Sequence, residues 1–436
     1  MRKALKQTGV AAGVAGVMGL WSGAAAALGN GVVVTPGLVV GEGSHAGSVH
    51  TIGSNPSGVA ASPRVGVQFG LGSVGAGYEV GKVDNLVDEV EALEEDLNKD
   101  NLTLTEAETI IDDAERVLAR LGEDGWGKLT LHGRPPVMPL IAGSARSGWS
   151  VGFDAEAMAQ AGFSVLDDDI RFVPLTQSLQ SRTSVYGKGG RLARVSVLPS
   201  FRIGEWSEGD LFFGARLSQY EAELGKTVIA LEEDSEFDEA LEDDLKDKTR
   251  STSAAGLDLG LTFKSSFFTA GATWLNVNEP SFDYPTIGTD CDSYTDTNLQ
   301  NNCYTAASFG DRIDLRETWT LNEQMRLEGA VHTPNERLTV AFSQELNSVR
   351  DMSGDEYQWQ TLSASFRLPW YLGWVPDLRA GYRQNLVGTE LSYTSVGLTW
   401  LGILSLDAAM ANETIEIDGD EAPRSAMVNL GLQMRF

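Results

Sequence analysis

Apolar and polar residues alternate with unusual regularity at the end of this chain. In an extended strand, successive side chains point to opposite faces, so such alternation gives one apolar face and one polar face. A lipid-facing strand of a membrane barrel has this pattern, with its polar residues turned toward the lumen. We therefore predict that residues 427–436 form the last strand of an outer-membrane β-barrel and are recognised by the barrel-assembly machinery. The apolar face of this C-terminal signature comprises Val428, Leu430, Leu432, Met434 and Phe436.

The same period-two pattern recurs along the second half of the chain. It is clearest in residues 257–263, 338–343, 362–368 and 404–410. Further strands are predicted near 192–203, 210–220, 267–276, 319–331, 377–386 and 390–400, with less regular ones near 64–80 and 146–154. The pattern predicts an all-β protein, a transmembrane barrel of about 14 antiparallel strands, within a range of about 12 to 16.

The connections between these strands alternate between short and long. Short turns are expected at 205–209, 264–266, 332–336 and 369–376, whereas the connections at 221–253, 277–317 and 413–424 are long or acidic. Outer-membrane barrels have short periplasmic turns and longer external loops. We therefore place the C-terminus on the periplasmic side and an acidic external loop at 221–253. Aromatic residues near the short turns suit an interfacial girdle: Trp206, Trp370, Tyr371, Trp374 and Trp400.

Residues 83–121 interrupt the strand pattern. Their apolar residues recur at helical spacing in two groups, 83–97 and 107–121, and Thr105 with Glu108 suggests a capping box. We predict a helical-hairpin insertion at one end of the barrel. It serves either as a packed cap or as a docking surface for a protein partner.

The N-terminus has the organisation of a secretory signal peptide. Arg2, Lys3 and Lys6 precede an uncharged apolar stretch at 10–21, and small residues follow at 24–27. This stretch is too short to span a membrane as a helix. We predict a signal peptide at residues 1–27, a hatch at 28–63 and the barrel at 64–436, exported to the outer membrane of a Gram-negative cell.

The formal net charge of −28 argues against a nucleic-acid partner, which would require a basic face. Much of the acidity is concentrated in 84–123 and 221–250, so it belongs mainly to solvated segments. Acidic groups such as Asp290, Asp292 and Asp296, or 167–169, could bind calcium in external loops, but solvated loops are the simpler interpretation. The pattern of the four histidines supports no metal site, and we predict no cofactor and no enzymatic activity.

The only two cysteines, Cys291 and Cys303, lie in a polar segment. In an exported protein we expect them to form a disulfide that closes a short loop, in preference to two free thiols. Their spacing is not that of a C-x-x-C redox motif.

Charged residues at lumen-facing positions of the predicted strands form a candidate network. One interpretation is a set of interior salt bridges that satisfies buried polar groups and stiffens the wall. The other is a path for a substrate or ion, although the mixed signs argue against strong ion selectivity. The candidates are Arg216, Asp258, Arg326, Glu328, Arg379, Arg383, Asp407 and Arg435.

Two sets of residues carry a family resemblance. Residues 53–60, with Asn55 and Pro56, resemble the motif that follows the N-terminal hatch of FadL- and PorV-like barrels, with Ser57 in place of the usual alanine. Residues 209–224, 254–263, 269–285 and 378–389 resemble blocks of the conjugal-transfer TraF-like family of outer-membrane proteins.

The resemblance implies two functions. The first is an accessory of conjugal transfer or export that binds protein partners. The alternative is a FadL-like channel for long-chain fatty acids or other hydrophobic compounds. Besides such a ligand and a protein partner, outer-membrane lipid would contact the barrel.

Overall fold

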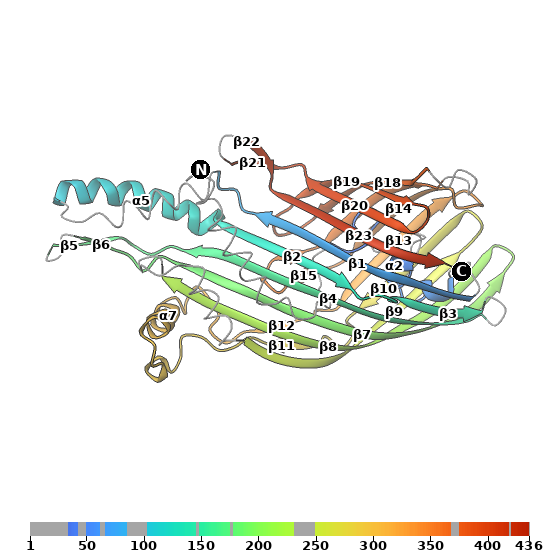
Figure 1. The fold of residues 1–436 in the computed structure, drawn as a ribbon, viewed down its shortest axis with the longest axis horizontal. Coiled ribbons are helices and arrows are strands. Elements are labelled where there is room, and N and C mark those ends of the chain that lie inside the picture. The colour runs from blue at the N-terminus through green and yellow to red at the C-terminus, as the bar shows by residue number, and fades with distance from the viewer. Residues whose placement is uncertain are drawn as a thin grey trace.

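The computed structural model of this chain describes residues 34–41, 49–61, 66–84, 103–144, 148–174, 178–230, 249–367, 375–417 and 420–435. Strands dominate these residues, and they form one large antiparallel sheet that closes on itself (Figure 1). None of the described helices has both the length and the apolar character needed to cross a bilayer.

The closed sheet has 14 strand positions. β2 and β3 share one of them, because both pair with β1 on one side and with β4 on the other. The predicted barrel of about 14 strands is therefore confirmed. Its strands are β1 (Gly66–Val80), β2 (Trp126–Arg134), β3 (Leu140–Ser144), β4 (Trp149–Leu166), β7 (Ser184–Trp206), β8 (Gly209–Ala230), β9 (Thr249–Lys264), β10 (Phe268–Leu275), β13 (Gln324–His332), β14 (Leu338–Glu345), β17 (Trp359–Phe366), β18 (Asp377–Asn385), β19 (Ser392–Trp400), β20 (Leu404–Ala411) and β23 (Ser425–Arg435).

Each strand position presents at least one large apolar side chain to the outside of the barrel. A continuous exposed apolar surface of this kind is unusual for a soluble protein and typical of a wall that faces lipid. Val195 and Val74, for example, are 63% and 61% exposed. The belt includes Val74, Leu131, Phe153, Val195, Leu217, Leu261, Trp274, Leu327, Val340, Leu362, Leu378, Val396, Leu406 and Leu430. Trp206 and Trp400 of the predicted girdle are exposed beside short turns, whereas Trp370, Tyr371 and Trp374 lie outside the described residues.

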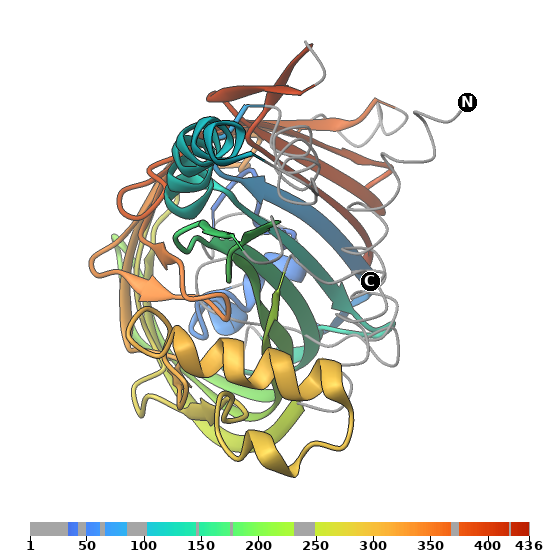
Figure 2. The same cartoon turned by 90° about the vertical axis from the view of Figure 1, so that its left-hand side faces the viewer.

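The two ends of the barrel differ. At one end, here called the turn end, short turns such as Trp206–Gly209 and Trp400–Leu404 join neighbouring strands, and the C-terminus lies there (Figure 1). At the opposite loop end, helices and small strand pairs extend beyond the wall, as the end-on view in Figure 2 shows. These pairs are β5 (Arg171–Val173) with β6 (Ser178–Gln180) and β21 (Thr414–Ile417) with β22 (Asp420–Pro423).

Several predicted boundaries were wrong. Residues 319–331 are not one strand, because the three residues 321–323 separate β12 (Thr318–Thr320) from β13. The external connection predicted at 221–253 is shorter, since β8 continues to Ala230 and β9 begins at Thr249; residues 231–248 lie outside the described residues. The segment 126–144 was not predicted as strand, yet it supplies β2 and β3.

The second half of the predicted helical insertion is α5 (Leu104–Asp124). Its capping box uses Thr103 and Glu106, two residues before the predicted pair, and this hydrogen bonding lowers the pKa of Glu106. Residues 85–102, which include most of the first predicted helical stretch, lie outside the described residues. The apolar face of α5, with Ala114, Leu118 and Leu121, packs on Val165 and Ile170 beyond the mouth of the barrel.

The described part of the hatch, residues 34–41 and 49–61, lies inside the barrel. It contains two single-turn helices, α2 (Val49–Ile52) and α3 (Gly58–Ala61), drawn in blue within the ring of strands in Figure 2. Nearly all of its described side chains are buried. It runs from Val34, which packs near the loop end on Tyr357 and Met427, to α3, which packs on β7 and Leu198.

A second set of segments closes the loop end, and we call it the cap. It comprises the ribbon of β11 (Ser281–Asp283) and β12, the helical segments η1 (Cys291–Ser293) and α7 (Thr297–Ser308), and the β15–β16 hairpin (Val349–Arg350 and Glu356–Tyr357). Phe282, Tyr284 and Trp319 of the cap pack on Leu192 and Tyr220 of the inner wall. The barrel interior near the loop end is therefore a packed core.

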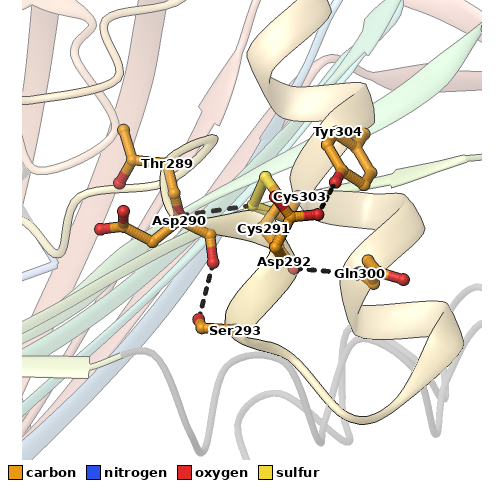
Figure 3. The surroundings of a disulfide bond; sticks show 8 residues. All are labelled: Thr289, Asp290, Cys291, Asp292, Ser293, Gln300, Cys303 and Tyr304. Carbon is orange, nitrogen blue, oxygen red and sulfur yellow. Dashed lines mark hydrogen bonds between the residues drawn. A yellow bond between two sulfur atoms is a disulfide. The ribbon is translucent and has the colours of Figure 1, made fainter.

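The disulfide between Cys291 and Cys303 is present, as predicted. It joins η1 to α7, and Tyr304 of α7 donates a hydrogen bond to Asp292 of η1 (Figure 3). Asp296 caps the N-terminus of α7. The hydrogen bond to Asp292 raises the pKa of the Tyr304 hydroxyl. Phe309 and Ile313 then pack on Val228 of β8, so the disulfide restrains a helix that is already anchored on the wall.

We expect the Cys291→Ser/Cys303→Ser variant to keep its barrel but to lose the compact α7 segment. Closing a loop of this length contributes about 3 kcal/mol in the chain-entropy model. Limited proteolysis in detergent should therefore cut the variant within 289–305 while the barrel still migrates as a folded species on an unheated gel. Equal cleavage of the oxidised protein and the variant would contradict this.

Candidate functional site

The lumen is the candidate functional site. With the turn end taken as the bottom of the barrel, the lower half of the lumen is built around the hatch. Three arginines from the wall donate hydrogen bonds to hatch carbonyl oxygens. Arg134 on β2 reaches the carbonyl of His50 at 2.9 Å, and Arg326 on β13 reaches that of Ser54 at 2.9 Å. Arg216 on β8 binds the carbonyl of Gly53. Three well-separated strands therefore hold the hatch through its backbone.

Asn55, the first residue of the predicted hatch motif, is completely buried. Its side-chain nitrogen donates to Glu328 at 2.9 Å and to the carbonyl of Leu261 at 3.2 Å. Its oxygen accepts from the nitrogen and hydroxyl of Ser57, at 3.1 and 2.6 Å. The Ser57 hydroxyl is also 2.7 Å from that of Thr262. Asn55 thus ties the turn between α2 and α3 to β9 and β13.

Glycines of the wall allow the hatch backbone to lie directly against the strands. A Cβ on Gly214 would come within 2.5 Å of the Pro56 oxygen and the Ser57 nitrogen, and one on Gly260 within 2.9 Å of the Pro56 ring. Gly381 and Gly75 face the carbonyls of Val39 and Val34 in the same way. These contacts explain part of the high glycine content, because only a residue without a Cβ permits this approach.

Two of the arginines that hold the hatch, Arg134 and Arg216, are paired with carboxylates of neighbouring strands. Arg216 is 2.9 Å from Asp258, and both are buried. Arg134 lies 3.0 Å from Asp154 and 2.6 Å from Glu156. Arg194 binds the other oxygen of Glu156. Side chains of adjacent strands therefore neutralise each other's buried charges. A buried charge without such a partner would be strongly destabilising.

The remaining predicted lumen residues form separate groups. Arg379 is 2.8 Å from Asp407, on the β18–β20 side. Arg383 stacks on Trp359, with 4.1 Å between its guanidinium carbon and the ring centre. Arg326 and Glu328 both contact the hatch, at adjacent residues. The side chain of Arg435 lies outside the described residues. The sequence did not identify Arg134, because β2 was not predicted, or Glu156, because β4 was predicted only to residue 154. It also did not identify Asp154 and Arg194, although both lie within predicted strands.

Above the hatch, described residues of the cap pack on the inner wall. A cavity of about 10 Å³, room for about one water molecule, lies between Glu79, Lys128, Tyr357 and Met427. Aromatic side chains of the inner wall and cap pack around it, with Tyr357 stacked on Trp359. Within the described residues, no three His, Cys, Asp or Glu side chains are grouped to hold a metal ion. Asp167 instead pairs with Arg312, and Asp296 caps α7.

Comparison with known families gives a match over most of the chain. The model of a family described as "F plasmid transfer operon, TraF, protein" matches residues 53–344. This range includes the hatch motif, α5 and the cap up to α7 and β12. No curated protein sequence matches the chain significantly.

Solved barrel structures are also similar in fold. A Pseudomonas aeruginosa FadL homologue shows 10% identity and a TM-score of 0.43, with 93% of this chain and 99% of that chain covered. The Pseudomonas putida toluene transporter TodX shows 13% identity and a TM-score of 0.39, with 88% and 93% covered. A TodX mutant described as a monoaromatic hydrocarbon channel shows 12% identity and a TM-score of 0.41, with the same coverage.

Proposed function

The chain belongs to the TraF family of the F plasmid transfer operon, and on this premise we propose that it is a non-enzymatic accessory of conjugal transfer or export. It acts by binding protein partners at the loop end of a sealed barrel in the outer membrane. The signal peptide predicted at residues 1–27 lies outside the described residues and remains a prediction. With the C-terminus on the periplasmic side, the loop end faces the cell exterior.

The observation that supports this proposal is the packing of the described hatch and cap inside the lumen. The hatch is held by side chains of β2, β8, β9 and β13, and the cap packs on the inner wall above it. A passage for solutes would require both to move. The loop end, in contrast, carries ordered surface elements that no described segment covers, with an exposed acidic face on α5.

The alternative is a channel for long-chain fatty acids or other hydrophobic compounds. It would be supported by an apolar pocket above the hatch. The described residues there line a cavity of about 10 Å³ beside Glu79 and Lys128, which has room for about one water molecule. The names of the similar barrels describe transport by those proteins. For this chain we favour partner binding.

A hatch that cannot move distinguishes the two functions. We expect the Ser57→Cys/Thr262→Cys variant to form a disulfide, because the two hydroxyl oxygens are 2.7 Å apart. In a donor strain that lacks the wild-type chain, this variant should restore plasmid transfer fully. Loss of transfer in the oxidised variant and recovery after reduction would instead support a moving hatch and the channel.

A second experiment changes side chains at the loop end alone. Reversing the charge of exposed residues on α5, with Glu108→Lys, Asp112→Lys and Glu115→Lys, should lower transfer by about tenfold or more if α5 binds a partner. The matched control reverses Glu205 and Glu208, which are exposed at the turn end. Equal transfer by the α5 variant and the wild type would argue against α5 as the docking surface.

A further inference from the structure

Three lysines form a row across the inner wall at the loop end. Strand register places Lys128 opposite Gly162, Gly162 opposite Lys188, and Lys188 opposite Lys226. The row therefore crosses β2, β4, β7 and β8 at one level. Lys128 and Lys226 are 4% and 0% exposed, and the side chain of Lys188 is 9% exposed. These lysines point into the barrel interior, where the cap lies.

The carboxylates that neutralise these lysines come from other parts of the fold than those that neutralise the arginines nearer the turn end. In the lower lumen, Arg134, Arg194 and Arg216 pair with Asp154, Glu156 and Asp258, all carried by wall strands. At the lysine row, the described wall supplies one carboxylate within ion-pair distance, Glu79, at 4.0 Å from Lys128. The other described carboxylates that pair with the row come from the cap and from the segment between α7 and β12. The described wall therefore presents a cationic surface that loop residues neutralise.

The cap residues divide the row into two parts. Lys128 binds Asp351 at 3.1 Å and Asp355 at 2.5 Å. Asp351 is completely buried, and it also accepts from Gln160, Ser353 and two backbone nitrogens of its own turn. Lys128 and Asp351 are therefore part of the packed interior. Gly162 leaves the space that the turn occupies, since a Cβ there would lie 3.0 Å from the Ser353 Cβ.

At the other part of the row, a single carboxylate spans two lysines. Glu317 places one oxygen 2.5 Å from Lys188 and the other 3.8 Å from Lys226. Its side chain is 23% exposed, so solvent reaches it from the loop end. Both ammonium groups also lie over the ring of Tyr284, at 5.1 and 5.6 Å from its centre. Glu317 is carried by the segment between α7 and β12.

We infer that Lys188 and Lys226 form a binding site for a phosphate group, and that Glu317 occupies this site as an internal carboxylate. A phosphate group presents several acceptor oxygens, so it can contact both ammonium groups as the two oxygens of Glu317 do. Lysine is a common phosphate-binding residue and acts there as a compact point charge. The phosphate belongs to a free phosphate compound or to a lipid headgroup that enters at the loop end. This inference goes beyond the proposed function and does not depend on it.

The test is a calorimetric titration of the full chain, in neutral detergent, with inorganic phosphate. Removing the charge of Glu317 leaves both lysines without its carboxylate, although Lys226 still donates a hydrogen bond to the carbonyl oxygen of Asp314. Glu317→Gln should therefore bind phosphate about tenfold more tightly than the wild type, or more. Adding Lys188→Gln to this variant should abolish binding. The matched control is Glu356→Gln, which removes an exposed carboxylate paired with Arg350 and should leave binding unchanged.

A second variant keeps the binding site testable if Glu317→Gln does not fold. Glu317→Asp keeps the charge but shortens the side chain, so it cannot span both lysines and should bind phosphate with intermediate affinity. Folding is checked by migration on unheated gels. If neither folded variant binds inorganic phosphate or micelles doped with a phosphomonoester lipid, the site is wrong. Binding of inorganic phosphate indicates a free phosphate compound, whereas binding of the doped micelles alone indicates a lipid headgroup.

Discussion

Replacing Gly214 with valine is expected to displace the hatch without opening the wall of the barrel. Even a Cβ at this position would come within 2.5 Å of the Pro56 oxygen and the Ser57 nitrogen. The wall strand cannot retreat, because β8 pairs with β7 and β9 along most of its length. The hatch must therefore move, and the hydrogen bonds of Asn55 and Ser57 to β9 and β13 are lost with it.

Limited proteolysis tests this expectation. Protease added from the turn-end side should cut the hatch of the variant within 49–61. The matched control is Gly329→Val on β13, because a Cβ at Gly329 meets nothing within 4 Å. A protease-resistant hatch in Gly214→Val would show that the hatch does not depend on this contact.

The second large effect is expected for Arg216→Ala. Arg216 is the ion-pair partner of Asp258 at 2.9 Å and also binds the hatch at Gly53. Asp258 is 2% exposed, so the variant would leave a buried carboxylate without its counter-charge. Breaking a buried pair in this way costs about 3–5 kcal/mol. The unfolding transition, followed in urea by loss of the folded band on unheated gels, should shift accordingly.

A double-mutant cycle separates the charge from the packing. Arg216→Ala/Asp258→Ala should recover part of the lost stability, because no unpaired charge remains. The control pair is Arg350 and Glu356, whose side chains are 66% and 40% exposed. Arg350→Ala should change stability by about 1 kcal/mol or less, since solvent screens the pair. A double variant no more stable than Arg216→Ala would show that Asp258 is not the reason for the loss.

The predictions from the sequence succeeded where one face of a strand meets lipid. The alternation in 257–263, 338–343 and 404–410 lies within β9, β14 and β20, because side chains there face either lipid or the interior with strict period two. The pattern failed in 126–144, where Leu129 and Leu131 are interrupted by His132, Gly133 and a proline-rich turn. It failed again after residue 154 of β4, where Ala155, Ala159 and Ala161, on the same face of the strand as Phe153, give little contrast with the polar positions.

The candidate site was predicted unevenly for the same reason. Arg216, Asp258, Arg379 and Asp407 were found because they occupy polar positions of clear alternating patterns, and the structure pairs Arg216 with Asp258 and Arg379 with Asp407. Arg134, Asp154 and Glu156 lie on the strands that were missed or truncated. The lysine row could not be recognised at all, because Lys128, Lys188 and Lys226 become neighbours only through the register of four strands.

By itself, the sequence determined the class of fold, the two kinds of barrel end, the hatch motif and the disulfide. These depend on local alternation, on turn length and on two cysteines that have no other partner in the chain. Only the tertiary structure decided which strands are neighbours, how the hatch lies on the wall and what fills the lumen. The physical reason is that the period-two alternation of side chains indicates which side of a strand faces lipid. Strand order, register and the path of a buried segment depend instead on contacts between residues far apart in the chain.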